Sequence, residues 1–470
     1  MSILNNLSPN RVFYYFEELC KIPHGSGNTD KISDYCVSFA KSLSLEVFKD
    51  SFNNVIIKKP ASAGYENRPT VILQGHLDMV CEKEPDCPID FEKDGLDLAF
   101  DGEFVYANGT TLGGDDGIAI AMALAILEDN SLEHPPIEAL FTTDEETGMY
   151  GAEGLDASKL SGKILINIDS EEEGILTVSC AGGARADINI PLVKESFSAP
   201  CCKITLDGLI GGHSGAEIDK GRLNSNVTMG LFLKFLPFNY NIIDIHGGLK
   251  DNAIPRATEA IIACNENVAD FVSEFVNSHK VSTDQGLSIS VSSVSCTEGY
   301  DLASSKKITD FLCNVPNGIQ SMSTDIDGLV QTSLNLGVLK IENDTLKATF
   351  AVRSSVNSEK YELLDKLEQV AKDFDGCYNS HAHYPAWEYR KDSPLRDTMA
   401  AVYEKLYGKA PKIEAIHAGL ECGLFSDKIK GLDAVSFGPD LYDIHTTRER
   451  MSVDSVKRTY EYLLEILKAL

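Results

Sequence analysis

The sequence lacks an excess of positive charge and has no long apolar run. It contains 42 Lys and Arg against 71 Asp and Glu, which gives a formal net charge of −29. Nucleic acids and anionic membranes bind clustered Lys and Arg, so this charge argues against either as a general partner. No stretch of about 18 apolar residues is present, so we expect no membrane-spanning helix.

Paired cysteine motifs and an export signal are also missing. The twelve cysteines are scattered along the chain and form no CxxC pair. The first ten residues, MSILNNLSPN, contain neither the basic nor the apolar segment of a signal peptide. Free thiols in a reducing compartment are the simplest interpretation. We therefore expect a cytoplasmic protein.

Short apolar runs alternate with helical patterns in the first part of the chain, where hydrophobic spacing predicts strands and helices. The expected strands are 55–57, 71–73, 137–141 and 164–168, and the expected helices are 29–45 and 117–128. Such alternation is typical of an α/β fold, a mainly parallel sheet with helices on both faces. Ser8 and Pro9 predict a further helix start, with Ser8 as N-cap and Pro9 at the first helical position.

The pattern changes after about residue 186, and 470 residues are too many for one core. β-patterned segments at 202–209 and 257–264 now lie among helical stretches, which is an α+β pattern. Apolar strand signals return after Pro385, and a helix is expected over 453–469. We predict a metal-binding catalytic domain of residues 1–186 and 386–470, interrupted by an inserted lid or dimerisation domain of residues 187–385.

Polar residues follow the predicted strands and suggest a metal site. His76 and Asp78 come after the strand at 71–73, and residues i and i+2 of an extended segment point to the same side. Asp78 could therefore fix the tautomer of His76 and strengthen it as a ligand. A chance His-x-Asp in a loop is the alternative. Asp115 ends the glycine-rich string GTTLGGD, which also fits an acidic cap of the next helix.

Further carboxylates occur at comparable positions. Glu145 and Glu146 follow the strand at 137–141, Asp169 ends the strand at 164–168, and His445 lies far downstream. Adjacent glutamates can divide metal binding and proton transfer between them, although in an acidic protein both could simply face water. Taken together, these side chains form a ligand set for two divalent cations at the carboxyl edge of a parallel sheet. Nitrogen and oxygen ligands without thiolate favour zinc, with manganese or cobalt as alternatives.

Several long strings occur in order along the chain: VILQGHLDMV, TTLGGDDGIAIA, TTDEETGM, NIDSEEEG, GGHSGAEI, NAIPR and HAGLECGLF. On these strings the sequence resembles, nearly end to end, the di-zinc metallopeptidase family that includes aminoacyl-histidine dipeptidases, carnosinases and tripeptidases. Its long insert is most similar to that of the aminoacyl-histidine (Xaa-His) dipeptidases. The resemblance implies hydrolysis of short peptides, with Xaa-His dipeptides as the favoured substrates, by a homodimer that carries two divalent metal ions.

The resemblance also implies a role for individual residues. One metal would be held by His76, Asp115 and Asp169, and the other by Asp115, Glu146 and His445, so Asp115 would bridge. Asp78 would orient His76, and Glu145 would be the general base. Asp116 stands where the family often has Asn, which adds negative charge near the site.

The remaining implied residues lie in the predicted insert. His213 would stabilise the oxyanion, in its own subunit or in the partner's, while Asn252 and Arg353 would hold the substrate. Closure of the insert would assemble the site. Without the resemblance, the string GGHSG around His213 also fits a simple glycine turn.

Two other functions remain open at this point. One is a different amidohydrolase of the same family, either a broader di- or tripeptidase or an amino-acid deacylase. The other is a non-catalytic binding protein that has kept the fold. That second alternative predicts the loss of a metal ligand or of the general base, whereas every expected position is filled.

Overall fold

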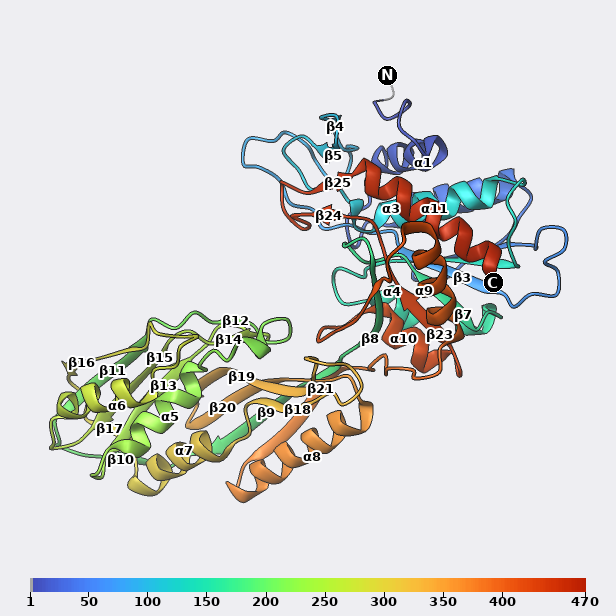
Figure 1. Ribbon diagram of the computed structural model, residues 1–470. Coiled ribbons are helices and arrows are strands. Elements are labelled where there is room, and N and C mark those ends of the chain that lie inside the picture. Colours follow the sequence, from blue (N-terminus) through green and yellow to red (C-terminus); the bar gives the residue numbers. More distant parts are fainter. Residues whose placement is uncertain (1–2) are drawn as a thin grey trace. The chain divides into compact units, whose positions relative to one another are not determined.

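The computed structural model describes residues 3–470, so Met1 and Ser2, at the start of the predicted catalytic domain, lie outside the described residues. The chain divides into two compact units (Figure 1). The first comprises the residues up to Ser179, Tyr389–Ala415 and Leu420–Leu470, and the second comprises Cys180–Glu388 and Ile416–Gly419. The assignment of a catalytic and a lid domain stays a prediction.

The first unit is built on an eight-stranded sheet in the order β1-β2-β6-β3-β7-β23-β8-β22. The strands are β1 (Glu46–Lys49), β2 (Val55–Lys59), β3 (Val71–His76), β6 (Ile137–Thr142), β7 (Ile164–Asn167), β8 (Ile175–Cys180), β22 (Lys412–Ile416) and β23 (Asp433–Ser436). The four central strands, β6, β3, β7 and β23, run parallel. Antiparallel pairs flank them, β2 with β6 on one side and β8 with β23 on the other.

Every residue of β3 and β6 is buried, which indicates that the helices of this unit cover both faces of the sheet. They are α1 (Asn10–Cys20), α2 (Asp30–Ser42), α3 (Gly114–Glu128), α4 (Tyr150–Gly154), α9 (Pro394–Tyr407), α10 (Glu421–Lys428) and α11 (Val453–Ala469), with a short 3₁₀ turn, η1 (Ala157–Lys159). The predicted α/β architecture is confirmed, with antiparallel strands added at its edges.

Two helix predictions can be compared directly with the structure. Helix α11 spans residues 453–469 as expected. The predicted start of α1 is wrong, because the helix begins at Asn10 and the extended Pro9 is its N-cap, without any capping side-chain hydrogen bond. Ser8 therefore does not act as the N-cap.

A smaller sheet of the first unit carries the loop that contains His445. Its strands are β4 (Leu98–Phe100), β5 (Phe104–Ala107), β24 (Leu441–Tyr442) and β25 (Arg450–Ser452), in the order β24-β25-β5-β4. Because β24 and β25 pair antiparallel, residues 443–449 form the connection of a hairpin.

The second unit contains a nine-stranded antiparallel sheet in the order β16-β11-β15-β13-β19-β20-β9-β21, with β18 paired to β19. The strands are β9 (Gly182–Pro191), β11 (Cys201–Asp207), β13 (Asn241–Gly247), β15 (Thr258–Ala263), β16 (Ser288–Val294), β18 (Gly318–Met322), β19 (Val330–Glu342), β20 (Thr345–Ser354) and β21 (Cys377–Tyr384). Two small sheets pair β10 (Lys194–Ser196) with β17 (Glu298–Tyr300), and β12 (Gly212–His213) with β14 (Ala253–Ile254).

Helices pack against this second sheet and close its core. They are α5 (Ser225–Phe235), α6 (Val272–His279), α7 (Leu302–Asn314) and α8 (Asn357–Asp373), with 3₁₀ turns η2 (Ile218–Lys220) and η3 (Val268–Phe271). Helices α5, α7 and α8 lie along one face of the sheet (Figure 1). Phe232, Phe311 and Phe350 are fully buried between these layers. The unit is α+β, as predicted for the insert.

A short downstream segment also joins the second unit. Residues 416–419 return to it because Ala181 N–H contacts the carbonyl oxygens of Ile416 at 3.1 Å and Ala418 at 3.0 Å. Over residues 3–470, none of the helices is long and apolar enough to cross a membrane.

Candidate metal centre

The parallel register of β3, β6 and β7 brings their carboxyl ends to one edge of the first sheet. His76, the last residue of β3, pairs with Thr142, the last residue of β6. Gln74 pairs with Asn167, which ends β7 two residues before Asp169. Side chains that directly follow these strands therefore meet at the edge where open α/β sheets place their sites.

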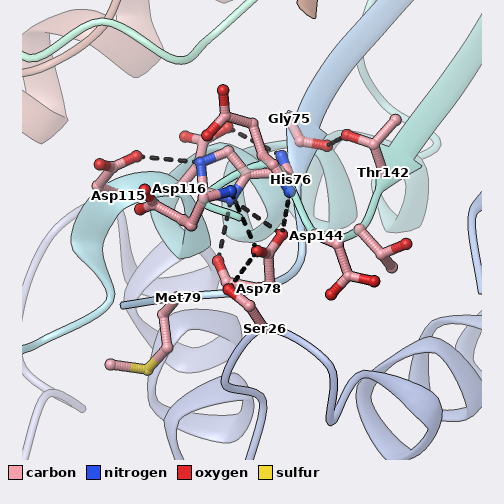
Figure 2. Close-up of polar contacts among 12 residues, drawn as sticks. Ser26, Gly75, His76, Asp78, Met79, Asp115, Asp116, Thr142 and Asp144 are labelled. Atoms are coloured by element: carbon pink, nitrogen blue, oxygen red, sulfur yellow. Dashed lines mark hydrogen bonds and ion pairs between the residues drawn. The ribbon is translucent and has the colours of Figure 1, made fainter. Parts of the chain in front are cut away.

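The ring of His76 lies between carboxylates and is 1% exposed (Figure 2). Its Nε2 is 3.1 Å from Asp115 Oδ1 and 3.6 Å from Asp169 Oδ1. Its Nδ1 is 2.9 Å from the carbonyl oxygen of Asp78 and 3.6 Å from that residue's carboxylate. Burial lowers the pKa of His76, but the bonds to Asp115 and Asp169 outweigh it and hold the pKa well above its usual value.

Asp115 presents one carboxylate oxygen to each of two histidines. While Oδ1 faces His76, Oδ2 lies 3.1 Å from His445 Nε2, which is also 2.9 Å from Glu146 Oε1. These bonds raise the pKa of His445 to about 10. Burial would raise the pKa of Asp115, yet hydrogen bonds to both histidines hold it below its usual range. A carboxylate that bridges two cations requires this arrangement, with one oxygen toward each.

The donor set fits divalent cations. Each of two groups of three side chains places its ligand atoms within 4.8 Å of one another, namely His76, Asp116 and Asp169, and His76, Asp115 and Glu146. Burial and neighbouring carboxylates raise the pKa of Asp169 to about 6, so a nearby positive charge would stabilise its ionised form. Imidazole nitrogen with carboxylate oxygen suits zinc and similar metals.

Asp116 was expected only to add charge, but the structure buries it. The side chain is 1% exposed, and its Oδ2 accepts the backbone N–H of His76 at 3.2 Å. A Cβ on Gly75 would lie only 2.4 Å from that oxygen, so glycine at 75 allows the start of α3 to approach β3. The Asp115–Asp116 peptide bond is cis.

Asp78 connects β3 to the loop that carries the paired glutamates. Its carboxylate accepts the Ser26 hydroxyl at 2.8 Å and the backbone N–H groups of Glu145 at 3.1 Å and Glu146 at 3.3 Å. Figure 2 shows Ser26 beside Asp78. Burial raises the pKa of Asp78, but its bonds to His76, Ser26 and the Glu145 N–H lower it overall. Ser26, in the string HGSG, was not predicted as part of the site.

The environments of Glu145 and Glu146 differ. Glu146 contacts His445, whereas burial and the charges of Asp169 and other carboxylates raise the pKa of Glu145 well above its usual value. A carboxylate whose pKa is raised accepts a proton more readily, which suits it to proton transfer. Glu145 and Glu146 thus lie in two different environments, as a division between proton transfer and metal binding would require.

The predicted oxyanion residue His213 and the predicted substrate residues Asn252 and Arg353 lie in the second unit. His213 pairs with Ala253 between β12 and β14, and the Ser214 N–H donates to the carbonyl oxygen of Asn252 at 2.9 Å. His213 and Asn252 therefore lie on neighbouring backbone segments. Among the described residues, Arg353 Nε is buried without a hydrogen-bond partner, and Arg353 Nη1 donates to the hydroxyl of Tyr384 at 3.0 Å.

Gly215 marks where these segments meet in the second unit. A Cβ at this position would lie 3.1 Å from His213 Cε1, 3.0 Å from Arg353 Nε and 2.6 Å from the carbonyl oxygen of His417. The GGHSG string is thus a close-packed turn that brings the two predicted side chains together. His417 is 8% exposed, and its Nε2 lies 2.7 Å from Ser333 Oγ.

Two buried glutamates were missed by the sequence analysis. Glu421 is fully buried, and its Oε2 accepts from Gln74 Nε2 at 2.6 Å and Thr142 Oγ1 at 2.7 Å, so it lies behind the ends of β3 and β6. Glu449 is 3% exposed although it stands between two arginines, in a run that looks solvent-exposed. No local pattern distinguishes either residue.

Comparison with known proteins agrees with this geometry. Residues 72–469 match the peptidase family M20/M25/M40. The cytosol non-specific dipeptidase of Escherichia coli (strain K12) is 38% identical, and the match covers 100% of this chain and 99% of that protein. The crystal structure of aminoacylhistidine dipeptidase from Vibrio alginolyticus is 36% identical with a TM-score of 0.93, covering 100% of this chain and 98% of that one.

A structure with lower sequence identity shares only the fold with this chain. The aminopeptidase PepT from Bacillus cereus has a TM-score of 0.57 at 16% identity and covers 98% of this chain and 99% of its own. Because the family match and the full-length relatives agree, the chain belongs to the peptidase family M20/M25/M40.

Proposed function

We propose that this chain is a metal-dependent dipeptidase that hydrolyses aminoacyl-histidine and other short dipeptides. The observation that carries the proposal is Asp115, whose two oxygens face His76 and His445 at 3.1 Å each. Full-length similarity to two proteins named as dipeptidases supports the substrate class. We further propose that the chain acts in the cytoplasm, as the name of the Escherichia coli relative suggests, and that it is a homodimer.

The proposed cofactor is a pair of divalent metal ions, with zinc favoured and manganese or cobalt as alternatives. His76, Asp115 and Asp169 would hold one ion, and Asp115, Glu146 and His445 the other. When bound, such a pair supplies Lewis acidity that polarises a peptide carbonyl and acidifies water. Asp78 would orient His76 through the contacts at Nδ1.

The other proposed roles belong to the side chains themselves. Glu145 would accept the proton from water and pass it to the leaving amine, which its raised pKa favours. In the second unit, His213 would donate to the developing oxyanion. Arg353 would bind the terminal carboxylate of the substrate, since its Nε is buried without a partner among the described residues. Asn252 would hold the substrate through its amide.

The substrate class is tested with a panel of peptides and the zinc-loaded protein. We expect turnover of β-alanyl-histidine and glycyl-histidine, and loss of turnover after chelation that zinc or manganese restores. Comparable rates on dipeptides without histidine would favour the broader specificity named for the Escherichia coli relative. Turnover of acylated amino acids alone would indicate a deacylase. Activity that persists after verified metal removal would refute the metal-dependent reaction.

A further inference from the structure

Glu449 makes an unusual set of contacts with the turn that precedes helix α3. Its Oε2 accepts the backbone N–H groups of Leu112 at 2.7 Å and Gly113 at 3.2 Å, and its Oε1 accepts that of Gly114 at 2.8 Å. Gly113 is the N-cap of α3 and Gly114 its first residue, so the N–H groups of these two residues have no partner within the helix. One buried carboxylate therefore satisfies three consecutive donors immediately before Asp115.

The glycines of this turn allow the carboxylate to approach. Gly113 has φ +66°, the left-handed region that favours glycine, and a Cβ on Gly114 would lie 3.3 Å from Glu449 Oε1. Side chains at these positions would strain the turn or displace the carboxylate. The two glycines therefore allow both the backbone turn and the close approach of the Glu449 carboxylate.

The same loop carries Glu449 and His445. Both lie in the hairpin connection between β24 and β25, and the Glu449 N–H contacts the carbonyl oxygen of Thr446 at 3.1 Å. His445 has φ +59°, a conformation that is unfavourable for a non-glycine residue and needs support from its surroundings. Anchoring of the loop through Glu449 provides such support.

We propose that Glu449 is a positioning residue that clamps the Asp115 turn to the His445 loop and so sets the distance between these two ligands. Glu449 is not among the proposed metal ligands or substrate-binding residues. This inference rests on the proposed metal centre, because its consequence is the affinity of that centre for metal. Replacement of a group that supports a metal ligand typically lowers metal affinity or activity by about 10- to 100-fold.

The test is the metal affinity of Glu449→Gln, measured by competition with a chromogenic chelator. The substitution keeps the shape of the side chain but replaces one acceptor oxygen with an NH₂ group that cannot accept an amide proton. We expect affinity for zinc to fall by about 10- to 100-fold and kcat to fall more than KM changes. Wild-type affinity in this variant would overturn the inference.

Glu138→Gln is the matched control. Glu138 is 2% exposed and accepts the backbone N–H groups of Ser161 at 2.8 Å and Gly162 at 3.0 Å, but it lies near the other end of β6 from Thr142. We expect this variant to lose stability and keep zinc affinity. If both variants lost zinc affinity equally, general loss of stability would explain the effect. That result would overturn the positioning role.

Two further outcomes separate the possible failures. If Glu449→Gln does not fold, Glu449→Asp gives the same test, because the shorter carboxylate cannot reach all three amides, and unchanged zinc affinity in it would overturn the inference. If the wild-type protein binds no metal, the proposed function fails. If the wild type binds metal and the Glu449 variants bind it equally well, only the positioning role fails.

Discussion

His445 Nε2 lies 3.1 Å from Asp115 Oδ2 although 330 positions separate the two residues in the chain. Asp115 lies in the first turn of helix α3, and His445 lies in the β24–β25 connection. The contact depends on the whole first unit being folded, since neither segment is near the other in sequence. Binding of a metal between Asp115 and His445 would therefore require that this unit is folded.

His445→Ala should remove one of the two proposed metals. The substitution deletes the imidazole that contacts Asp115 at 3.1 Å and Glu146 at 2.9 Å, while His76, Asp115 and Asp169 remain. We expect about one zinc ion per chain instead of two, measured by elemental analysis after dialysis, with turnover lost. His246→Ala, an exposed histidine of the second unit, is the control and should keep both. Two tightly held ions in His445→Ala would contradict the assignment.

Glu145→Gln should abolish turnover and leave the metals in place. The change removes the proposed base, and loss of a general base typically costs about 10²- to 10⁴-fold in kcat. Asp144→Asn is the neighbouring control, because the Asp144 carboxylate accepts the Gly27 N–H at 2.6 Å and has no proposed role in the reaction. Steady-state kinetics and metal analysis of both variants test the assignment. Near-native kcat in Glu145→Gln would refute it.

The sequence predicted those features that a local pattern encodes. Apolar runs located β3, β6 and β7, and the polar residues at the ends of these runs were expected at one edge, where the structure places His76 and Asp169 3.6 Å apart. Parallel pairing explains this success, since strand ends that align in register bring their following residues together.

The features that were missed depend on contacts between distant segments. Ser26 reaches Asp78 from the first loop, and Glu449 reaches the α3 turn from more than 300 residues downstream. Neither residue belongs to a periodic pattern, and both are polar in stretches that resemble ordinary surface loops. Their roles follow from tertiary packing, which hydrophobic spacing does not encode.

Arg353→Lys should raise KM more than it lowers kcat. Lysine keeps the charge but loses the planar fork that binds a carboxylate through two parallel bonds. We expect KM for glycyl-histidine to rise by about tenfold or more, equivalent to about 1.4 kcal/mol. Arg185→Lys, also in the second unit and paired with Asp251, is the control and should change KM little. Equal kinetics for Arg353→Lys and the wild type would argue against a carboxylate-binding role.

The lowered pKa of His417 should make the folded protein less stable in mild acid than at neutral pH. Burial first, and then the charge of Arg353, lower the pKa of His417 to about 4. An unfolded histidine titrates near 6.5, so between about pH 6.5 and 4 the unfolded chain binds a proton that the folded chain does not. The stabilisation from neutral His417 is therefore fully present above pH 6.5 and is lost as the pH falls toward 4, by about 2 kcal/mol at pH 5.

His417→Asn isolates this contribution from other titrating groups. Asparagine carries no proton in this range and can still bond to Ser333 Oγ, so the variant should lose less stability between pH 7.5 and pH 5 than the wild type does. Urea unfolding of the metal-free proteins at both pH values measures the difference. Equal losses for the two proteins would mean that His417 titrates normally in the folded chain, and its burial beside Arg353 would then not disfavour the charged form.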